Sequence, residues 1–249
     1  MINVNVGQLE KYLNEYLRVS EFEDYTFNGL NIGKRIWQVT GVITATDYDR
    51  SLVDIALDRN ASVIIVHHGL WWGKPYTISD EVYDDFSYLM GNNVALLAYH
   101  LPLDAHPNVG NNAFILGAIG IPSSTWQPLD VGFFVDVDLT VTDITAKLES
   151  TFGMPSSVWE FRDGYVRRLG VTSGSGGGFI DQLVSNGIDT FITGEVTYPQ
   201  WREFRRHKIN LLLYGHYRSE TGGPKLLASH LERKLGIKAW FVDIYDRAL

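Results

Sequence analysis

The sequence predicts an α/β protein built from two similar α/β domains with mixed, largely parallel sheets. Three observations carry this prediction. Short runs of aliphatic and β-branched residues, typical of buried strands, alternate with segments of helical periodicity. The chain has 249 residues, enough for one large domain or two small ones. A pattern of strand, helix and strand over 41–68 recurs over 170–195, and in both copies the second strand ends in residues able to bind a metal.

The elements are expected in the following order. Apolar residues at spacings of three and four, beginning with Val6, predict a first helix. Strands are expected at 36–44, 61–66, 94–99, 133–141, 158–161 and 166–172, and helices at 47–59, 79–90, 109–119 and 143–152. We expect a first domain at 1–125 plus 206–249 and a second domain at 126–205.

The composition restricts the chemistry. The chain has seven His and no Cys, which excludes disulfides, thiol catalysis, zinc fingers and iron–sulfur clusters, so any metal must be held by His, Asp or Glu. The net charge of −8 argues against a general nucleic-acid binder. The N-terminal segment lacks the pattern of a signal peptide, and no apolar run approaches the roughly 18 residues of a membrane span. We therefore expect a cytoplasmic protein with no membrane partner.

Side chains able to bind a metal follow the ends of several predicted strands. In parallel α/β sheets, ligands gather at the carboxyl ends of strands, so this clustering predicts a metal site. The strand-end residues are His67, His68, His100, Glu195 and His216, and the carboxylates that follow are Asp104 and Glu220.

Some of these residues allow more than one interpretation. Neighbours on a strand point to opposite faces, so His67 and His68 serve one site only if the strand ends there, as the following Gly69 permits. They could instead bind two separate ions, or one could be buried and hydrogen-bonded with the other exposed. Asp104 is able to bridge two cations about 3.5–4 Å apart. The alternative is an Asp that caps a turn.

Three further residues also allow more than one interpretation. His216 and Glu220 have the i, i+4 spacing that shares a helix face, but the surrounding glycines favour a loop before a helix that starts near Pro224. Glu195 is a candidate ligand, general base or orienter of a ligand His, with an ordinary Glu at a helix N-terminus as the alternative.

Other features carry weaker signals. Trp71 and Trp72 are candidates for lining a pocket for a planar ligand, although Trp usually belongs to a core or an interface. The glycine run 174–178 matches no nucleotide fingerprint, and a simple turn is favoured over a phosphate-binding turn. Lys74 and Arg218 lie near candidate residues and could meet a phosphate. His207 and His230 fall in predicted helices and are expected at the surface.

The ordered set of motifs resembles one known family. Four stretches carry the resemblance, at 64–69, 99–106, 191–195 and 215–220, preceded by Asp24-Tyr25 and Asn28-Gly29-Leu30. Together they resemble the NIF-three-like family, also called dinuclear metal-centre proteins or GTP cyclohydrolase 1 type 2 homologues. The resemblance covers essentially the whole chain and is closest to the short bacterial form.

The resemblance implies two interlinked α/β domains with a dinuclear metal site between them, in a ring-shaped homohexamer. It implies two divalent metal ions per subunit. Carried over by position, the metal ligands are His67, His68, Asp104, His216 and Glu220. His and carboxylate ligands suit Zn, Fe, Mn, Co or Ni equally well.

Two functions are compatible with these features. The first is a metal-dependent hydrolase of the GTP cyclohydrolase type, or of related nucleotide or amide bonds, in which Glu195 or His100 moves protons. Its partners are a nucleotide or another small molecule. The alternative is a non-catalytic metal-binding ring that acts as a metal store or as a regulatory protein. Closed coordination favours a structural role, whereas open coordination favours catalysis.

Overall fold

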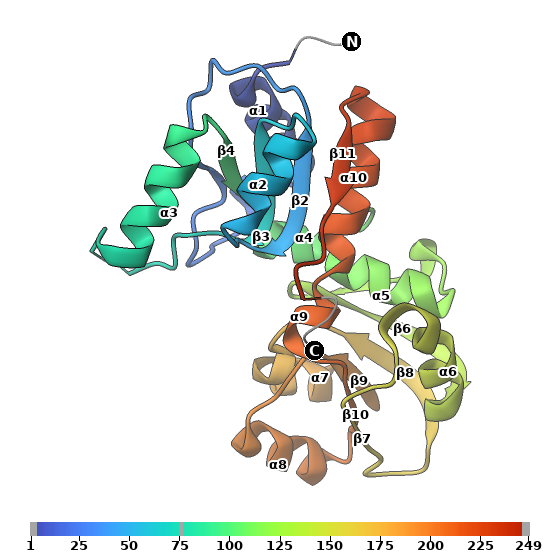
Figure 1. Ribbon diagram of the computed structural model, residues 1–249. Helices are drawn as coiled ribbons and strands as arrows, with labels where there is room; N and C mark the ends of the chain where they lie inside the picture. The colour runs from blue at the N-terminus through green and yellow to red at the C-terminus, as the bar shows by residue number, and fades with distance from the viewer. Residues whose placement is uncertain (1–3, 75–76, 246–249) are drawn as a thin grey trace. The chain divides into compact units, whose positions relative to one another are not determined.

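The computed structural model describes residues 4–74 and 77–245, which fold into two compact units (Figure 1). Unit 1 comprises Met1–Leu103 and Pro224–Leu249, and unit 2 comprises Asp104–Gly223. Each unit has its own sheet and its own helices, which confirms the predicted class of two α/β domains with mixed sheets. Residues 1–3, 75–76 and 246–249, which the predicted first domain included, lie outside the described residues.

The elements are as follows. Unit 1 contains α1 (Val6–Tyr16), β1 (Gly29–Ile32), β2 (Val42–Asp47), α2 (Ser51–Asp58), β3 (Val63–His68), α3 (Asp80–Gly91), β4 (Ala95–Ala98) and β11 (Ala239–Phe241). Unit 2 contains α5 (Asn111–Ile119), β5 (Gln127–Leu129), β6 (Gly132–Thr140), α6 (Val141–Phe152), β7 (Ser157–Trp159), β8 (Tyr165–Val171), α7 (Ile180–Ser185), β9 (Thr190–Thr193), α8 (Tyr198–His207), β10 (Asn210–Leu213) and α9 (His216–Ser219). The unit boundaries fall within α4 (Leu101–Ala105) and α10 (Gly222–Leu235).

The sheet of unit 1 has the order β1-β4-β3-β2-β11. Among these described strands, only the β1–β4 pair is antiparallel. Ile43, Ile64 and Leu96 face α2 and α3 in one core cluster. On the other face of β2, the Thr44 hydroxyl donates a hydrogen bond to the Pro224 carbonyl of α10 (2.9 Å). Helices therefore cover both faces, which explains why these parallel strands are apolar throughout.

The sheet of unit 2 has the order β5-β6-β8-β9-β10-β7. Within the described part of this sheet, β8–β9 and β9–β10 pair in parallel and the other pairs are antiparallel, so the sheet is mixed, with fewer parallel pairs than the sheet of unit 1. Neighbouring residues of β9 point to opposite cores, because Ile192 packs with α5 and α6 and Phe191 packs with α7 and α8. This unit is also a three-layer arrangement.

The two units share one run of elements. In unit 1, β2, α2, β3, α3 and β4 form three consecutive parallel strands joined by helices, and β8, α7, β9, α8 and β10 do the same in unit 2. Parallel strands place their carboxyl ends at one edge of a sheet. The recurrence seen in the sequence therefore corresponds to the same topology in both units.

The domain bounds differ from those expected from the sequence. Segments 104–125 and 206–223 belong to unit 2. The first segment contains α5, whose Ile115, Leu116 and Ile119 lie in the core of the unit 2 sheet. The second contains β10, which pairs with β9. Within the described residues, no helix has both the length and the apolar character that crossing a bilayer requires.

His230 is buried, against the expectation of a surface residue. Its Nε2 lies 2.6 Å from the Tyr12 hydroxyl of α1, and its ring stacks on Tyr16 with the centroids 4.1 Å apart. Burial, with the nearby charges of Lys234 and Arg233, lowers the pKa of His230 below its usual 6.5. His230 therefore fastens α1 to α10 in its neutral form.

A pH dependence of stability follows from this contact. Because the folded pKa is the lower one, His230 contributes stability above about pH 6.5, and this is lost as the pH falls through the folded value. We expect the urea midpoint to fall from pH 7.5 to 5.5, and to fall less in His230→Gln. His207→Gln, in the exposed part of α8, is the control and should keep the wild-type dependence. An unchanged dependence in His230→Gln would contradict this role.

Candidate metal centre

Unit 1 brings three of the predicted residues together. His67 and His68 end β3, and His100 follows the neighbouring strand β4, so all three stand at the same edge of the sheet. The ring centroids lie 4.5 Å apart for His67 and His68, 5.1 Å for His67 and His100, and 5.7 Å for His68 and His100. One ring nitrogen from each lies within 4.8 Å of the others, as a shared metal ion would require. We call these residues the three-histidine group.

Gly69 explains how neighbouring histidines reach one site. β3 ends at His68, as the single-site interpretation required. A Cβ on Gly69 would lie 2.5 Å from the Cβ of Ala98 and 2.7 Å from the Asn31 Oδ1, so only glycine fits at this position. The chain turns away there, and the alternation of side chains along the strand stops.

Each histidine of this group has its Nδ1 against an oxygen. The Nδ1 of His67 lies 3.0 Å from the Tyr99 carbonyl, which can only accept, so this nitrogen carries the proton. The Nδ1 of His68 lies 2.6 Å from the Asp47 Oδ1, and that of His100 lies 3.0 Å from the Asp24 Oδ1. Each contact fixes the orientation of its ring, as in carboxylate–histidine–metal arrangements.

Asp24 is a buried carboxylate that accepts several hydrogen bonds. Besides His100, it accepts from the backbone and hydroxyl of Thr26, from the Asn28 amide and from the Leu101 backbone. Burial raises the pKa of Asp24, but the hydrogen bonds from His100 and Asn28 outweigh it, and the pKa lies well below the usual range. Asp24 therefore stays ionised and holds His100.

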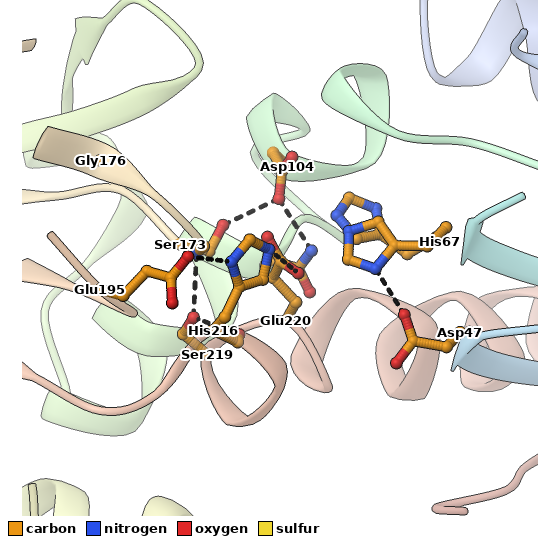
Figure 2. A network of polar contacts seen from close by, with 12 residues as sticks. Asp47, His67, Asp104, Ser173, Gly176, Glu195, His216, Ser219 and Glu220 are labelled. Carbon is orange, nitrogen blue, oxygen red and sulfur yellow. Dashed lines mark hydrogen bonds and ion pairs between the residues drawn. The ribbon is translucent and has the colours of Figure 1, made fainter. Parts of the chain in front are cut away.

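Unit 2 brings together the other predicted ligands (Figure 2). Asp104 lies in α4, His216 is the first residue of α9, and Glu220 follows that helix. The His216 Nε2 lies 3.2 Å from the Glu220 Oε2, and one oxygen each of Asp104 and Glu220 lie within 4.8 Å. The expected loop at 216–220 is thus wrong, since one helical turn places His216 and Glu220 on the same face.

The Asp104 carboxylate is fixed by protein donors. Its Oδ1 accepts from the Asn111 amide (2.9 Å) and from the Ser173 hydroxyl (2.8 Å). Asn112 adds a bridge, because its amide donates to the Asp104 carbonyl and its oxygen accepts from the Ser173 backbone. These hydrogen bonds fix the orientation of the carboxylate, and the bridging role considered for Asp104 stays a prediction. The Asp104 side chain is buried.

Glu195 contacts a predicted ligand directly. It follows β9, and its Oε1 lies 3.0 Å from the Nδ1 of His216 (Figure 2). Hydrogen bonds and charge from Glu220, and then from Glu195, raise the pKa of His216 to about 9 against the opposing effect of burial. Of the roles left open by the sequence, this geometry favours the orienter of a ligand His. The proton-transfer roles of Glu195 and His100 stay predictions.

The glycine run 174–178, which lies beside Glu220 and His216, forms a turn held by hydrogen bonds to neighbouring side chains. The Gly174 amide donates to the Ser219 hydroxyl, and the Gly176 amide donates to the Thr193 hydroxyl. Gly174 has φ +60° and carries its α-carbon against the Glu220 carboxylate. Arg218 donates to the carbonyls of Phe152 and Met154 at the end of α6, which accounts for its position without a phosphate.

Sequence reasoning missed the orienting carboxylates. Asp47 ends β2, beside β3 in the parallel sheet, and the strand-end rule applied to the histidines could have found it. Asp24 is 76 positions from His100, in an irregular segment whose fold the sequence does not predict. His106 accepts backbone hydrogen bonds from Asn108 and Val109, which gives it a role in this turn.

The donor set fits divalent transition metals. Imidazole suits Zn, Fe, Ni and Cu, and carboxylates extend the range to Mn and Mg. Unit 1 contains the three-histidine group, and unit 2 contains Asp104, His216 and Glu220. These buried His, Asp and Glu clusters could bind metal ions.

The chain matches one family model and many curated relatives. Residues 4–247 match the model of Duf34/NIF3 (NGG1p interacting factor 3). A Deinococcus radiodurans protein is 31% identical, covering 95% of this chain and 92% of its own length, and a Yersinia pestis protein is 34% identical, covering 97% and 98%. Each is named GTP cyclohydrolase 1 type 2 homolog.

Solved structures show the same fold. A crystal structure of a Thermus thermophilus protein is 33% identical with a TM-score of 0.88, covering 96% of this chain and 98% of its own. The structure titled protein ybgI, unknown function, is 29% identical with a TM-score of 0.87, covering 98% and 100%. The family resemblance expected from the motifs is confirmed: the chain belongs to the Duf34/NIF3 family.

Proposed function

We propose that the protein is a hydrolase dependent on two divalent metal ions, with His67, His68, Asp104, His216 and Glu220 as the ligands. One observation carries this proposal. His67, His68 and His216, together with His100, each have their Nδ1 within 3.0 Å of an oxygen acceptor, which is the arrangement by which outer-shell oxygens orient metal-ligating histidines. His67 and His68 end β3, and His100 and His216 follow β4 and β10.

The chemistry divides between the metal and the protein. When bound, divalent ions would supply a water of lowered pKa and polarise the bond to be cleaved. Asp24 holds the His100 ring by Nδ1, so the Nε2 of His100 is placed to accept and return a proton. Glu195 holds His216 in the same manner. The names of the curated relatives support a nucleotide or a ring amide as substrate, by cyclohydrolase-type hydrolysis.

The experiment compares metal content and turnover in one series. Stripped protein is reloaded with Zn, Mn, Fe or Co, its metal is measured by mass spectrometry, and hydrolysis of GTP and other nucleotides is followed by chromatography. We expect Asp104→Ala to lose bound metal and turnover. It removes a buried ligand whose carboxylate is held in place by hydrogen bonds from Asn111 and Ser173. Asp138→Ala, a carboxylate on β6 away from the cluster, is the control and should match wild type.

The outcomes separate the two candidate functions. Wild-type metal content and turnover in Asp104→Ala would contradict the ligand set. Metal bound by wild type without turnover under any of the four ions would overturn the hydrolase and favour a metal store or regulatory protein. The family resemblance further supports a ring-shaped homohexamer, which mass measurement in solution decides. The cytoplasmic location stays a prediction.

A further inference from the structure

Unit 1 has an aromatic pocket that the proposed metal chemistry does not use. Its volume is about 590 Å³, within the range of small-molecule sites. It lies between the segment after Asp24 and the segment after β3. The residues that define it are Tyr25, Phe27, Asn31, Trp71, Trp72 and Lys74.

The pocket is held open by the backbone and not by chance side-chain positions. The Phe27 amide donates to the Trp71 carbonyl (3.4 Å), which joins the two walls. Asn31 donates to the carbonyls of Phe27 and Gly29 and accepts from the Leu70 amide, so it fastens the floor. Gly73 has φ +68°, and a Cβ there would lie 2.5 Å from the Tyr25 carbonyl. Such a preformed pocket costs little ordering on binding.

The aromatic pocket borders the three-histidine group. The ring of Trp72 lies 5.3 Å from that of His68 and 5.7 Å from that of His100. Tyr25 meets His100 edge to face, with the centroids 5.3 Å apart. A molecule bound against Trp72 therefore has one edge beside the histidines that we propose as metal ligand and proton carrier.

The exposed aromatic side chains that line the pocket favour a ligand with a planar ring. The side chains of Tyr25, Phe27 and Trp72 are 61%, 53% and 41% exposed, which is unusual for three neighbouring aromatic residues. The rings of Tyr25 and Trp72 are 6.0 Å apart, too close for another ring between them, so a ligand must stack on their outer faces. Stacking on such faces tolerates any flat heteroaromatic ring.

The positive charge of Lys74 in the lining favours a ligand that carries an acidic group. Lys74 is the one charged side chain among the described residues that line the pocket. Lys74 would repel a cationic ligand, and the described lining offers such a ligand no carboxylate. Lys74 would instead attract the carboxylate or phosphate of an anionic ligand. Ring and charge together favour a heteroaromatic anion over a neutral lipid or a quaternary ammonium.

We propose that the aromatic pocket binds the ring of a heteroaromatic anion, with Trp72 stacking on the ring and Lys74 contacting the acidic group. As the substrate subsite, it rests on the proposed hydrolase function. Binding itself requires only the pocket, so it can be measured without turnover.

The experiment uses the full chain, metal-stripped and metal-loaded, with three probes that separate ring from charge. GMP carries both, guanosine carries the ring alone, and ribose 5-phosphate carries the charge alone. Calorimetry gives the dissociation constants, and saturation-transfer NMR shows which ligand protons contact the protein. We expect GMP to bind most tightly, with the strongest saturation on the base, and ribose 5-phosphate to bind most weakly.

The variants test each contact. Trp72→Ala should weaken GMP and guanosine by about tenfold or more, and Trp72→Phe, which keeps a stacking face, should recover most of the loss. Lys74→Ala should weaken GMP only. Trp159→Ala on β7 is the matched control, since Trp159 is also 41% exposed, and Lys147→Ala on α6 controls for charge.

The results distinguish the two proposals. If guanosine and GMP fail to bind wild type in either metal state, or if Trp72→Ala binds them as wild type does, the pocket assignment is overturned and the metal-dependent hydrolysis keeps its own test. If the ring binds as expected but no metal restores turnover, the proposed hydrolase function is overturned and the pocket assignment is supported.

Discussion

Replacing Gly174 with alanine is expected to disrupt the candidate metal ligands of unit 2, Asp104, His216 and Glu220, without changing any of these three residues. Gly174 has φ +60°, where an L-residue is disfavoured. Its added Cβ would overlap the Glu220 Oε1 and lie 3.2 Å from the His216 Nε2. The methyl group would therefore occupy the space between the carboxylate and the imidazole.

The surroundings cannot relax to accept this methyl group. The Gly174 amide is held by the Ser219 hydroxyl, and the Gly174 carbonyl accepts from the Glu195 amide. Glu220 is buried, so it cannot swing into solvent. We expect a loss of about 2–4 kcal/mol in the free energy of unfolding, from overpacking plus backbone strain. Metal affinity should fall by at least about tenfold, as when supporting groups are lost.

The measurement pairs urea unfolding with calorimetric titration of Mn or Zn. Gly178→Ala is the control in the same loop, because its Cβ meets no heavy atom within 4 Å and its φ is not positive. It should stay within about 0.5 kcal/mol of wild type and bind metal normally. Normal metal binding by Gly174→Ala would show that Glu220 and His216 do not form the site.

The sequence predicted the candidate residues because their placement follows from strand geometry. His67 and His100 end adjacent parallel strands, so the rule that strand ends share an edge already brings them together. Glu195 and His216 follow β9 and β10 in the same manner. These predictions needed only the apolar runs and the residues that end them.

Short helices were missed because periodicity needs length. α4 has five residues and α9 has four, too few to show a repeat of 3.6. Pro102 is the second residue of α4, where its missing amide hydrogen costs nothing. Consequently only the structure decided between the helix and the loop that the sequence allowed for His216 and Glu220.

The domain bounds depended on information that the sequence lacks. α5 is apolar on nearly all sides, with Ala113, Ile115, Leu116 and Ile119 buried, so its pattern does not show which sheet it covers. The structure assigns it to unit 2 through contacts with β6 and β8. Long-range contacts also place Asp24 on His100.

Two of the candidate histidines occupy corresponding positions of the topology that the two units share, and a carboxylate holds each of them. In each unit, the third parallel strand is followed by a His, namely His100 and His216. A carboxylate lies four positions after each in the sequence, Asp104 and Glu220, and both carboxylates belong to unit 2. In each case an acidic residue from elsewhere in the same unit holds the Nδ1 of that His, namely Asp24 and Glu195. This parallel makes Asp24 the counterpart of Glu195, and it predicts that removing Asp24 has a large effect.

We expect Asp24→Asn, which replaces one carboxylate oxygen with an amide nitrogen, to destabilise unit 1 strongly. Asp24 accepts from five donors on two oxygens, and asparagine offers one oxygen. If that oxygen faces Thr26 and His100, the new amide points at the donors of Asn28 and Leu101, and the opposite flip reverses the conflict. We expect a loss of about 3–5 kcal/mol in the free energy of unfolding, because buried donors lose a charged acceptor.

The functional consequence should be visible apart from stability, because Asp24 also sets the tautomer of His100. Nitrogen-detected NMR of the histidine rings should show His100 protonated on Nδ1 in wild type and as a mixture in Asp24→Asn, with turnover reduced more than metal content. Asp136→Asn, an exposed carboxylate paired with Arg168, is the control and should change stability and the His100 signal little. If Asp24→Asn kept the wild-type His100 tautomer, Asp24 would be a packing residue, and the equivalence with Glu195 would fail.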